Sequence, residues 1–231
     1  MKIYLRDINP KIVDAWRKEF GNYQDFEIGL GYIFDGPKAD ALVSPSNSFG
    51  FLDGGIDAVY SERFGDELGQ KLRGIITDWF DGELIVGQAV ILPTGDEEFP
   101  YMISAPTMRV PGVVKNSVNA YLAFRGALKA VRDWNDSPKN EYKQINSILC
   151  PGLGTAIGQI HPEACARQML EAYEVMVLGK RLKPKDCTEI WYNQQCLLGW
   201  PPYELKVGEY SYAKKEDAEQ GEIDLWKGQD L

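Results

Sequence analysis

The sequence is poor in metal-binding residues, with one histidine and four cysteines among 231 residues. The cysteines at positions 150, 165, 187 and 196 form no C-x-x-C pair, and His161 alone cannot complete a cysteine–histidine cluster. We therefore expect no metal site and no cofactor. Few and scattered cysteines are typical of reduced thiols, which predicts a cytoplasmic protein.

Long apolar runs and excess positive charge are lacking too. No stretch approaches the roughly 18 apolar residues of a membrane-spanning helix, and the start, MKIYLRDINP, does not resemble a secretion signal. The 25 basic and 34 acidic residues give a net charge of −9, which disfavours sequence-independent binding to nucleic acid. The absence of G-K-[ST] excludes a P-loop. A small phosphate-bearing ligand stays compatible, because backbone N–H groups bind anions without net positive charge.

What is present is an alternation of short apolar segments with stretches of helical periodicity. Such alternation predicts a three-layer α/β domain with a largely parallel sheet. The expected strands cover residues 2–5, 26–34, 41–43, 84–86, 89–92, 101–105 and 145–150. The expected helices cover residues 10–20, 56–64, 67–80, 115–134 and 162–177.

The chain changes character near residue 178, so we expect a domain over residues 1–178 and a C-terminal extension over 179–231. The extension starts with a basic linker at 180–185, and aromatic and leucine residues between 191 and 203 favour partial docking on the domain. Residues 204–231 contain eight acids and four bases. Such a composition predicts an acidic tail that is mobile or loosely docked.

Two glycine-rich loops each follow an apolar strand and lead into a helix, at residues 44–57 and 151–158. Ligands in open α/β sheets bind outside the carboxyl ends of the strands, and glycines let backbone N–H groups approach an anion closely. Each loop alone is equally compatible with a simple turn. The pair favours a ligand with two phosphates. A dinucleotide-binding G-x-G-x-x-G is a weaker match, because Gly152, Gly154 and Gly158 contain one residue too many and come late in the chain.

The order ADALVSPSN, GGIDAVYSERFG and ILCPGLGTAIGQIHPEACARQM resembles the macrodomain family over roughly residues 25–178. The resemblance implies a mixed, largely parallel sheet of six or seven strands in an α/β/α sandwich that binds ADP-ribose or a relative in a surface cleft. It also implies two catalytic candidates. Asn47 would contact the distal ribose, and Asp57, a carboxylate expected to be ionised at neutral pH, would activate a water.

The resemblance makes residues 154–158 the diphosphate loop, matches residues 54–56 to the family's Gly-Gly-Gly-Val segment and assigns the base to residues 31–33. An Asx turn at Asn47 and a favourable helix-start charge at Asp57 are the alternatives that need no ligand. The full set of expected ligand-binding residues is Gly31, Tyr32, Ile33, Ser46, Asn47, Gly54, Gly55, Ile56, Gly152, Gly154, Thr155, Ala156, Ile157 and Gly158.

This sequence also departs from the family pattern. Tyr32 replaces the aspartate that holds the adenine amine, which predicts weak selection of adenine. Ser44 replaces the first asparagine, and Ile157 replaces an aromatic residue over the distal ribose. Three functions remain open: hydrolysis of an ADP-ribosylated macromolecule or of ADP-ribose 1″-phosphate, recognition of such a ligand without chemistry, and a scaffold with a vestigial cleft.

Overall fold

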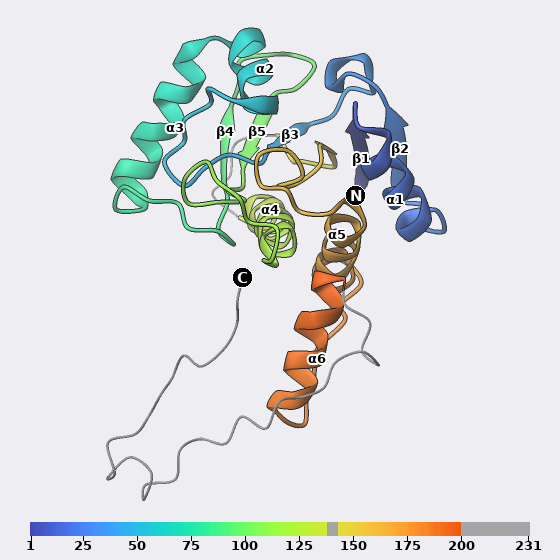
Figure 1. Cartoon of the computed structure of the whole chain (residues 1–231). Helices are drawn as coiled ribbons and strands as arrows, with labels where there is room; N and C mark the ends of the chain where they lie inside the picture. The colour runs from blue at the N-terminus through green and yellow to red at the C-terminus, as the bar shows by residue number, and fades with distance from the viewer. Residues whose placement is uncertain (138–142, 200–231) are drawn as a thin grey trace, which may run out of the picture.

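The computed structural model of the chain describes residues 1–137 and 143–199 (Figure 1). Two expectations, for the aromatic residues Trp200 and Tyr203 and for the acidic tail 204–231, lie outside these residues. The strands are β1 (Lys2–Asp7), β2 (Phe26–Leu30), β3 (Ala41–Ser44), β4 (Val90–Pro93), β5 (Tyr101–Ser104) and β6 (Ser147–Cys150). The helices are α1 (Pro10–Phe20), α2 (Gly55–Phe64), α3 (Asp66–Trp79), α4 (Asn119–Asp136), α5 (Pro162–Met176) and α6 (Cys187–Leu198), with one 3-10 turn, η1 (Ile33–Asp35).

The strands form one six-stranded sheet in the order β2-β1-β6-β3-β5-β4. All neighbours pair in parallel except the edge strand β4, which runs antiparallel to β5. The predicted fold, an α/β/α sandwich with a mixed, largely parallel sheet, is therefore confirmed. Its central strands β1, β6 and β3 end at the same edge, where the two glycine loops leave the sheet.

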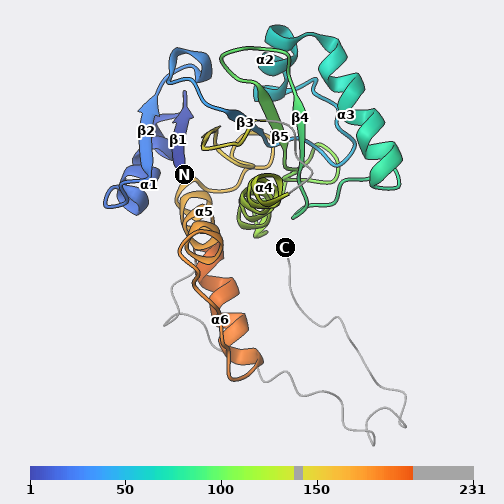
Figure 2. The same cartoon turned by 180° about the vertical axis from the view of Figure 1, so that it is seen from behind.

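Helices cover both faces of the sheet (Figures 1 and 2), with α2 and α3 on one face and α1, α4 and α5 on the other. Alternate side chains of one strand pack into the cores on opposite faces of the sheet. Val43 belongs to the core under α1, α4 and α5, whereas its neighbour Leu42 belongs to the core under α2 and α3. Burial on both faces explains why the central strands are continuous apolar runs in the sequence.

Helix α6 lies against α5 and extends away from the sheet (Figure 2). Leu197 is buried there, and the Gln168 Nε2 of α5 donates to its carbonyl oxygen over 3.1 Å. The part of the extension that the structure describes is thus docked at this point. The division at residue 178 itself stays a prediction.

Two expected strand segments are wrong. The strand expected over 26–34 stops at Leu30, because Gly31 has φ of +137° and the N–H of Asp35 then donates to the Tyr32 carbonyl, which closes η1. The segment 84–86 is not in the sheet. The N–H of Leu84 donates to the Ser48 carbonyl instead, so this segment runs beside the first glycine loop.

Helix α4 packs closely on the chain before β4, which predicts opposite outcomes for two glycine-to-alanine variants. A Cβ at Gly126 of α4 would lie 2.8 Å from the Gly87 carbonyl oxygen, whereas a Cβ at Gly74 of α3 meets no atom within 4 Å. We expect Gly126→Ala to destabilise the protein by about 1–3 kcal/mol and Gly74→Ala to stabilise it by about 0.4–1 kcal/mol. Urea unfolding of both variants measures this, and equal shifts would contradict the packing described here.

Candidate functional site

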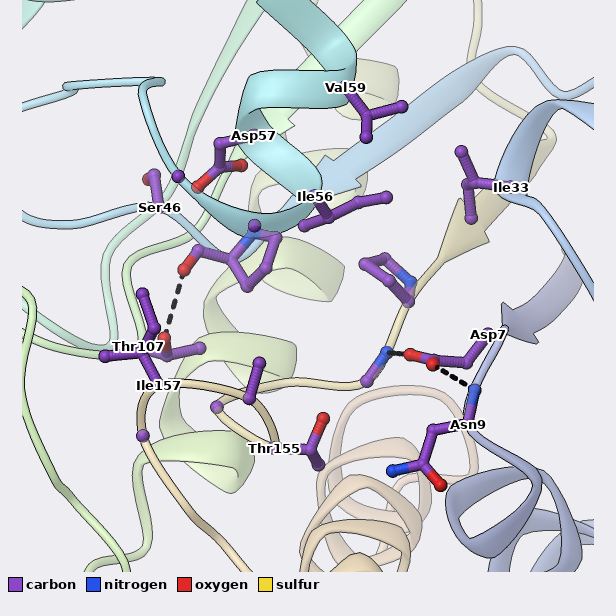
Figure 3. Close-up of a pocket in the computed structure, with 18 of the residues that line it drawn as sticks. Asp7, Asn9, Ile33, Ser46, Ile56, Asp57, Val59, Thr107, Thr155 and Ile157 are labelled. Carbon is purple, nitrogen blue, oxygen red and sulfur yellow. Dashed lines mark hydrogen bonds between the residues drawn. The ribbon is translucent and has the colours of Figure 1, made fainter.

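A pocket of about 500 Å³ opens at the carboxyl ends of β1, β3 and β6. Its walls come from the two glycine loops, the end of β1 and the turn after β2 (Figure 3). Every residue of the expected ligand-binding set lines this pocket, together with the catalytic candidate Asp57. Segments that are more than a hundred residues apart in the sequence therefore meet in one cavity.

The first loop presents the start of α2 to the pocket. Gly54 is the N-cap residue, and Gly55 follows with φ of +57°, a conformation that favours glycine. The N–H groups of Gly55 and Ile56 have no hydrogen-bond partner among the described residues. Unpaired N–H groups at a helix N-terminus attract an anion.

The second loop adds a further set of free donors. The N–H groups of Thr155, Ala156, Ile157 and Gly158 have no partner within the described part of the chain. Hydrogen bonds at both ends of the loop fix its shape, because Ile160 N donates to Gly154 O over 3.0 Å and Val114 N donates to Gly158 O over 2.8 Å. A fixed loop of unpaired N–H groups is a preformed anion site.

The two loops approach each other across the pocket. A Cβ at Gly54 would lie 3.9 Å from Cδ1 of Ile157, and the Ile157 side chain is 51% exposed. Residues of both loops that carry the unpaired N–H groups line the same pocket. Ile157 thus stands as an apolar side chain at the rim between the loops.

Asp57 lies in the first turn of α2 with only 8% of its surface exposed. The Ser44 hydroxyl, at the end of β3, donates to its Oδ1 over 2.7 Å. Burial raises the pKa of Asp57 from 3.8 to about 7; the Ser44 hydrogen bond opposes this rise, and the charge of Asp53 adds to it. The expectation of a fully ionised carboxylate at neutral pH is therefore corrected, because this carboxyl titrates near pH 7.

Asn47 adopts the Asx turn that the sequence left open. Its Oδ1 accepts from the N–H groups of Phe49 and Phe51 over 3.0 and 3.4 Å, and its Nδ2 donates to the Phe51 carbonyl over 2.8 Å. Ser46 is likewise engaged, since its hydroxyl lies 2.7 Å from the Ser104 hydroxyl. Both side chains therefore hold the shape of the first loop.

The opposite end of the pocket contains residues that sequence reasoning missed. The Asp7 carboxylate, at the end of β1, accepts from Asn9 N over 2.8 Å and from Gly152 N over 3.0 Å (Figure 3). It thereby ties the second loop to β1. Arg6 also lines the pocket. The available signal was the polar pair Arg6-Asp7 at the end of an apolar strand, but its place beside β6 depends on a pairing across more than a hundred residues.

Residues 1–137 and 143–199 contain neither a metal-binding cluster nor a membrane-spanning helix. No group of three or more His, Cys, Asp or Glu side chains is arranged there to hold a metal ion. No helix of these residues has the length and apolarity to cross a membrane. The candidate functional site is therefore the pocket between the two glycine-rich loops, called the glycine-loop pocket below.

This chain belongs to the macrodomain family, which binds ADP-ribose: the sequence model described as "Macro domain" matches residues 43–169. An uncharacterized protein of Aquifex aeolicus is 30% identical over 133 residues, which are 58% of this chain and 72% of the relative. An uncharacterized protein of Aeropyrum pernix is 26% identical over 139 residues, which are 60% of this chain and 66% of that relative.

Solved macrodomain structures share the fold at low sequence identity. The macrodomain of Mycobacterium tuberculosis DarG aligns with a TM-score of 0.52 at 20% identity, over 64% of this chain and 88% of its own. A glycine-to-valine variant of the Oceanobacillus iheyensis macrodomain, solved with ADPR, aligns with a TM-score of 0.53 at 15% identity, over 72% and 90%. The resemblance inferred from the two loops is thus confirmed for the family and the fold.

The raised pKa of Asp57 predicts a pH-dependent effect of Asp57→Asn. The folded-state pKa of about 7 exceeds the ordinary 3.8, so the wild type loses stability as the pH rises from about 4 to about 7, by a few kcal/mol. The neutral asparagine escapes this loss. We expect the variant to gain stability relative to wild type between pH 4 and pH 8, as measured by urea unfolding.

The matched control is Asp78→Asn on the exposed side of α3. The difference in free energy of unfolding between this variant and wild type should be nearly the same at pH 4 and at pH 8. A constant difference for Asp57→Asn as well would show that the Asp57 carboxyl is not held in an unfavourable charged state.

Proposed function

We propose that this protein binds ADP-ribose or a closely related nucleoside diphosphate ribose in the glycine-loop pocket. One observation carries the proposal: two sets of unpaired backbone N–H groups, from the start of α2 and from residues 155–158, line one pocket. Two adjacent anion sites suit the two phosphates of a diphosphate. Family membership supports this ligand class, and solved Oceanobacillus iheyensis macrodomains contain ADPR and ADP.

The orientation of the ligand follows from the two ends of the pocket. Asp57 and Ser46 lie toward one end, while Ile33, Asp7 and Asn9 lie toward the other (Figure 3). With the diphosphate between the loops, the distal ribose reaches the Asp57 end and the base reaches Ile33. A net charge of −9 is compatible with this binding, because backbone dipoles at short range supply the attraction to the phosphates.

We further propose that the site hydrolyses an ADP-ribosyl bond, with Asp57 as general base. The carboxylate takes a proton from water while the water oxygen bonds to the anomeric carbon of the distal ribose. The bond from that carbon to the leaving group breaks, and the leaving group takes up the proton that Asp57 releases. A base with a pKa of about 7 is well matched to this task at neutral pH. The substrate would be an ADP-ribosylated macromolecule or ADP-ribose 1″-phosphate, in the cytoplasm.

The second candidate is a binding protein without catalysis. The observation that favours it is the Asx turn of Asn47, whose amide atoms all bond within the first loop. These bonds fix the amide within the loop and leave only one of the two Nδ2 hydrogens to contact the distal ribose. Binding of ADP-ribose without turnover would select this candidate.

Gly54→Val tests the binding site without disturbing the fold. Gly54 has φ of −145° and ψ of 151°, which valine adopts readily, and its Cβ would meet only Ile157. The added methyl groups narrow the gap between the loops, so we expect affinity for ADP-ribose to fall at least tenfold with little change in melting temperature. Calorimetric titration measures this, and wild-type affinity in the folded variant would refute the loop assignment.

The catalytic proposal predicts the effects of two variants on turnover of an ADP-ribosylated peptide. The turnover rate of Asp57→Ala should be about 10²-fold or more below that of wild type, which is the usual contribution of a positioned base. Ser44→Ala should keep activity but shift the rise of the pH–rate profile to higher pH, because the Ser44 hydrogen bond lowers the pKa of Asp57. Full turnover by Asp57→Ala would remove Asp57 from the mechanism.

A further inference from the structure

Arg6 lines the pocket beside Asp7 and Asn9, and a hydrogen bond holds its guanidinium in place. Its Nε donates to the Tyr32 carbonyl over 2.7 Å. Within the described residues, no carboxylate lies at ion-pair distance from it, and neither Nη1 nor Nη2 has a hydrogen-bond partner. A partly buried cation with unused donors beside a pocket is available to a ligand.

Three glycines make the space that this guanidinium occupies. A Cβ would lie 2.5 Å from Nη1 at Gly29, 2.7 Å from Nη2 at Gly31 and 2.6 Å from Cδ at Gly36. Any side chain at these positions would displace Arg6 from the slot. The close packing against these glycines and the hydrogen bond to the Tyr32 carbonyl restrict the rotamers of Arg6. Ligand binding therefore costs little further side-chain conformational entropy.

The surroundings of Arg6 suit a flat base. Ile33 is buried, and Tyr32, which also lines the pocket, is 42% exposed. Asp7 supplies the carboxylate at this end, and each of its oxygens already accepts one backbone N–H. Arginine has no acceptor, so the unused hydrogen-bonding groups of Arg6 are donors, which need acceptors on the ligand.

We propose that this pocket selects a 6-oxopurine, guanine or hypoxanthine, over adenine, with Arg6 Nη1 and Nη2 donating to O6 and N7 of the base; this proposal rests on the proposed nucleotide-binding function. Two parallel N–H groups of arginine match the two acceptors O6 and N7. Adenine keeps N7 but places an amine donor in the position of O6. The predicted discrimination against adenine is about tenfold or more.

Calorimetric titrations of the full chain with GDP, IDP, ADP and 7-deaza-GDP test the proposal. Wild type should bind GDP and IDP at least tenfold more tightly than ADP, and 7-deaza-GDP, which lacks N7, should bind more weakly than GDP. In Arg6→Gln, the affinities for GDP and IDP should fall to the affinity for ADP. The matched control, Arg17→Gln on the exposed side of α1, removes one charge outside the pocket and should change none of these affinities.

The outcomes separate this proposal from the proposed function. Tighter binding of ADP than of GDP by wild type overturns the base selection and leaves the nucleotide site intact, whereas no binding of any nucleotide overturns both. If Arg6→Gln loses the same factor of affinity for ADP and for GDP, Arg6 contacts the phosphates. That result also overturns the proposed selection of the base. The comparison of GDP with 7-deaza-GDP on wild type needs no variant, so a misfolded Arg6→Gln does not prevent the test.

Discussion

Parallel pairing of β3 with β6 is the constraint on which the site depends. Ala41 lies beside Ile148 and Leu42 beside Leu149, so both strands end at the same edge and release their loops side by side. Each loop then turns into a helix and leaves backbone N–H groups unpaired near that edge. An antiparallel arrangement would separate these loops to opposite edges of the sheet, and no common pocket would form.

Burial of Asp57 connects the stability of the fold to its chemistry. The carboxyl is in the first turn of α2, where the helix dipole favours negative charge, yet its removal from water raises its pKa to about 7. A carboxyl with this pKa is partly neutral at pH 7, which reduces repulsion of a diphosphate, and the ionised fraction is a better base than an exposed aspartate. The same burial therefore weakens the folded state at high pH and suits the carboxyl to the general-base role proposed for it.

The sequence predicted the features that depend on local pattern. Strand and helix periodicity gave the sandwich, and glycine content after two strands identified the loops that form the pocket. Features that depend on distant pairing were missed. Arg6 and Asp7 line the pocket only because β1 lies between β2 and β6. A local feature was missed as well, because the positive φ of Gly31 ends β2 and the turn at Ile33–Asp35 replaces the expected strand. The raised pKa of Asp57 depends on burial, which no motif records.

The backbone N–H groups of the two loops are proposed to hold a diphosphate, and binding through them can be observed one amide at a time. The direct measurement is a ¹H–¹⁵N NMR titration of the labelled protein with ADP-ribose and with GDP. We expect large shifts of the amide signals of Gly55, Ile56 and residues 155–158, with small shifts for the amides of exposed α3 residues such as Asp78. Saturable binding that leaves all of the loop amides unshifted would contradict this expectation.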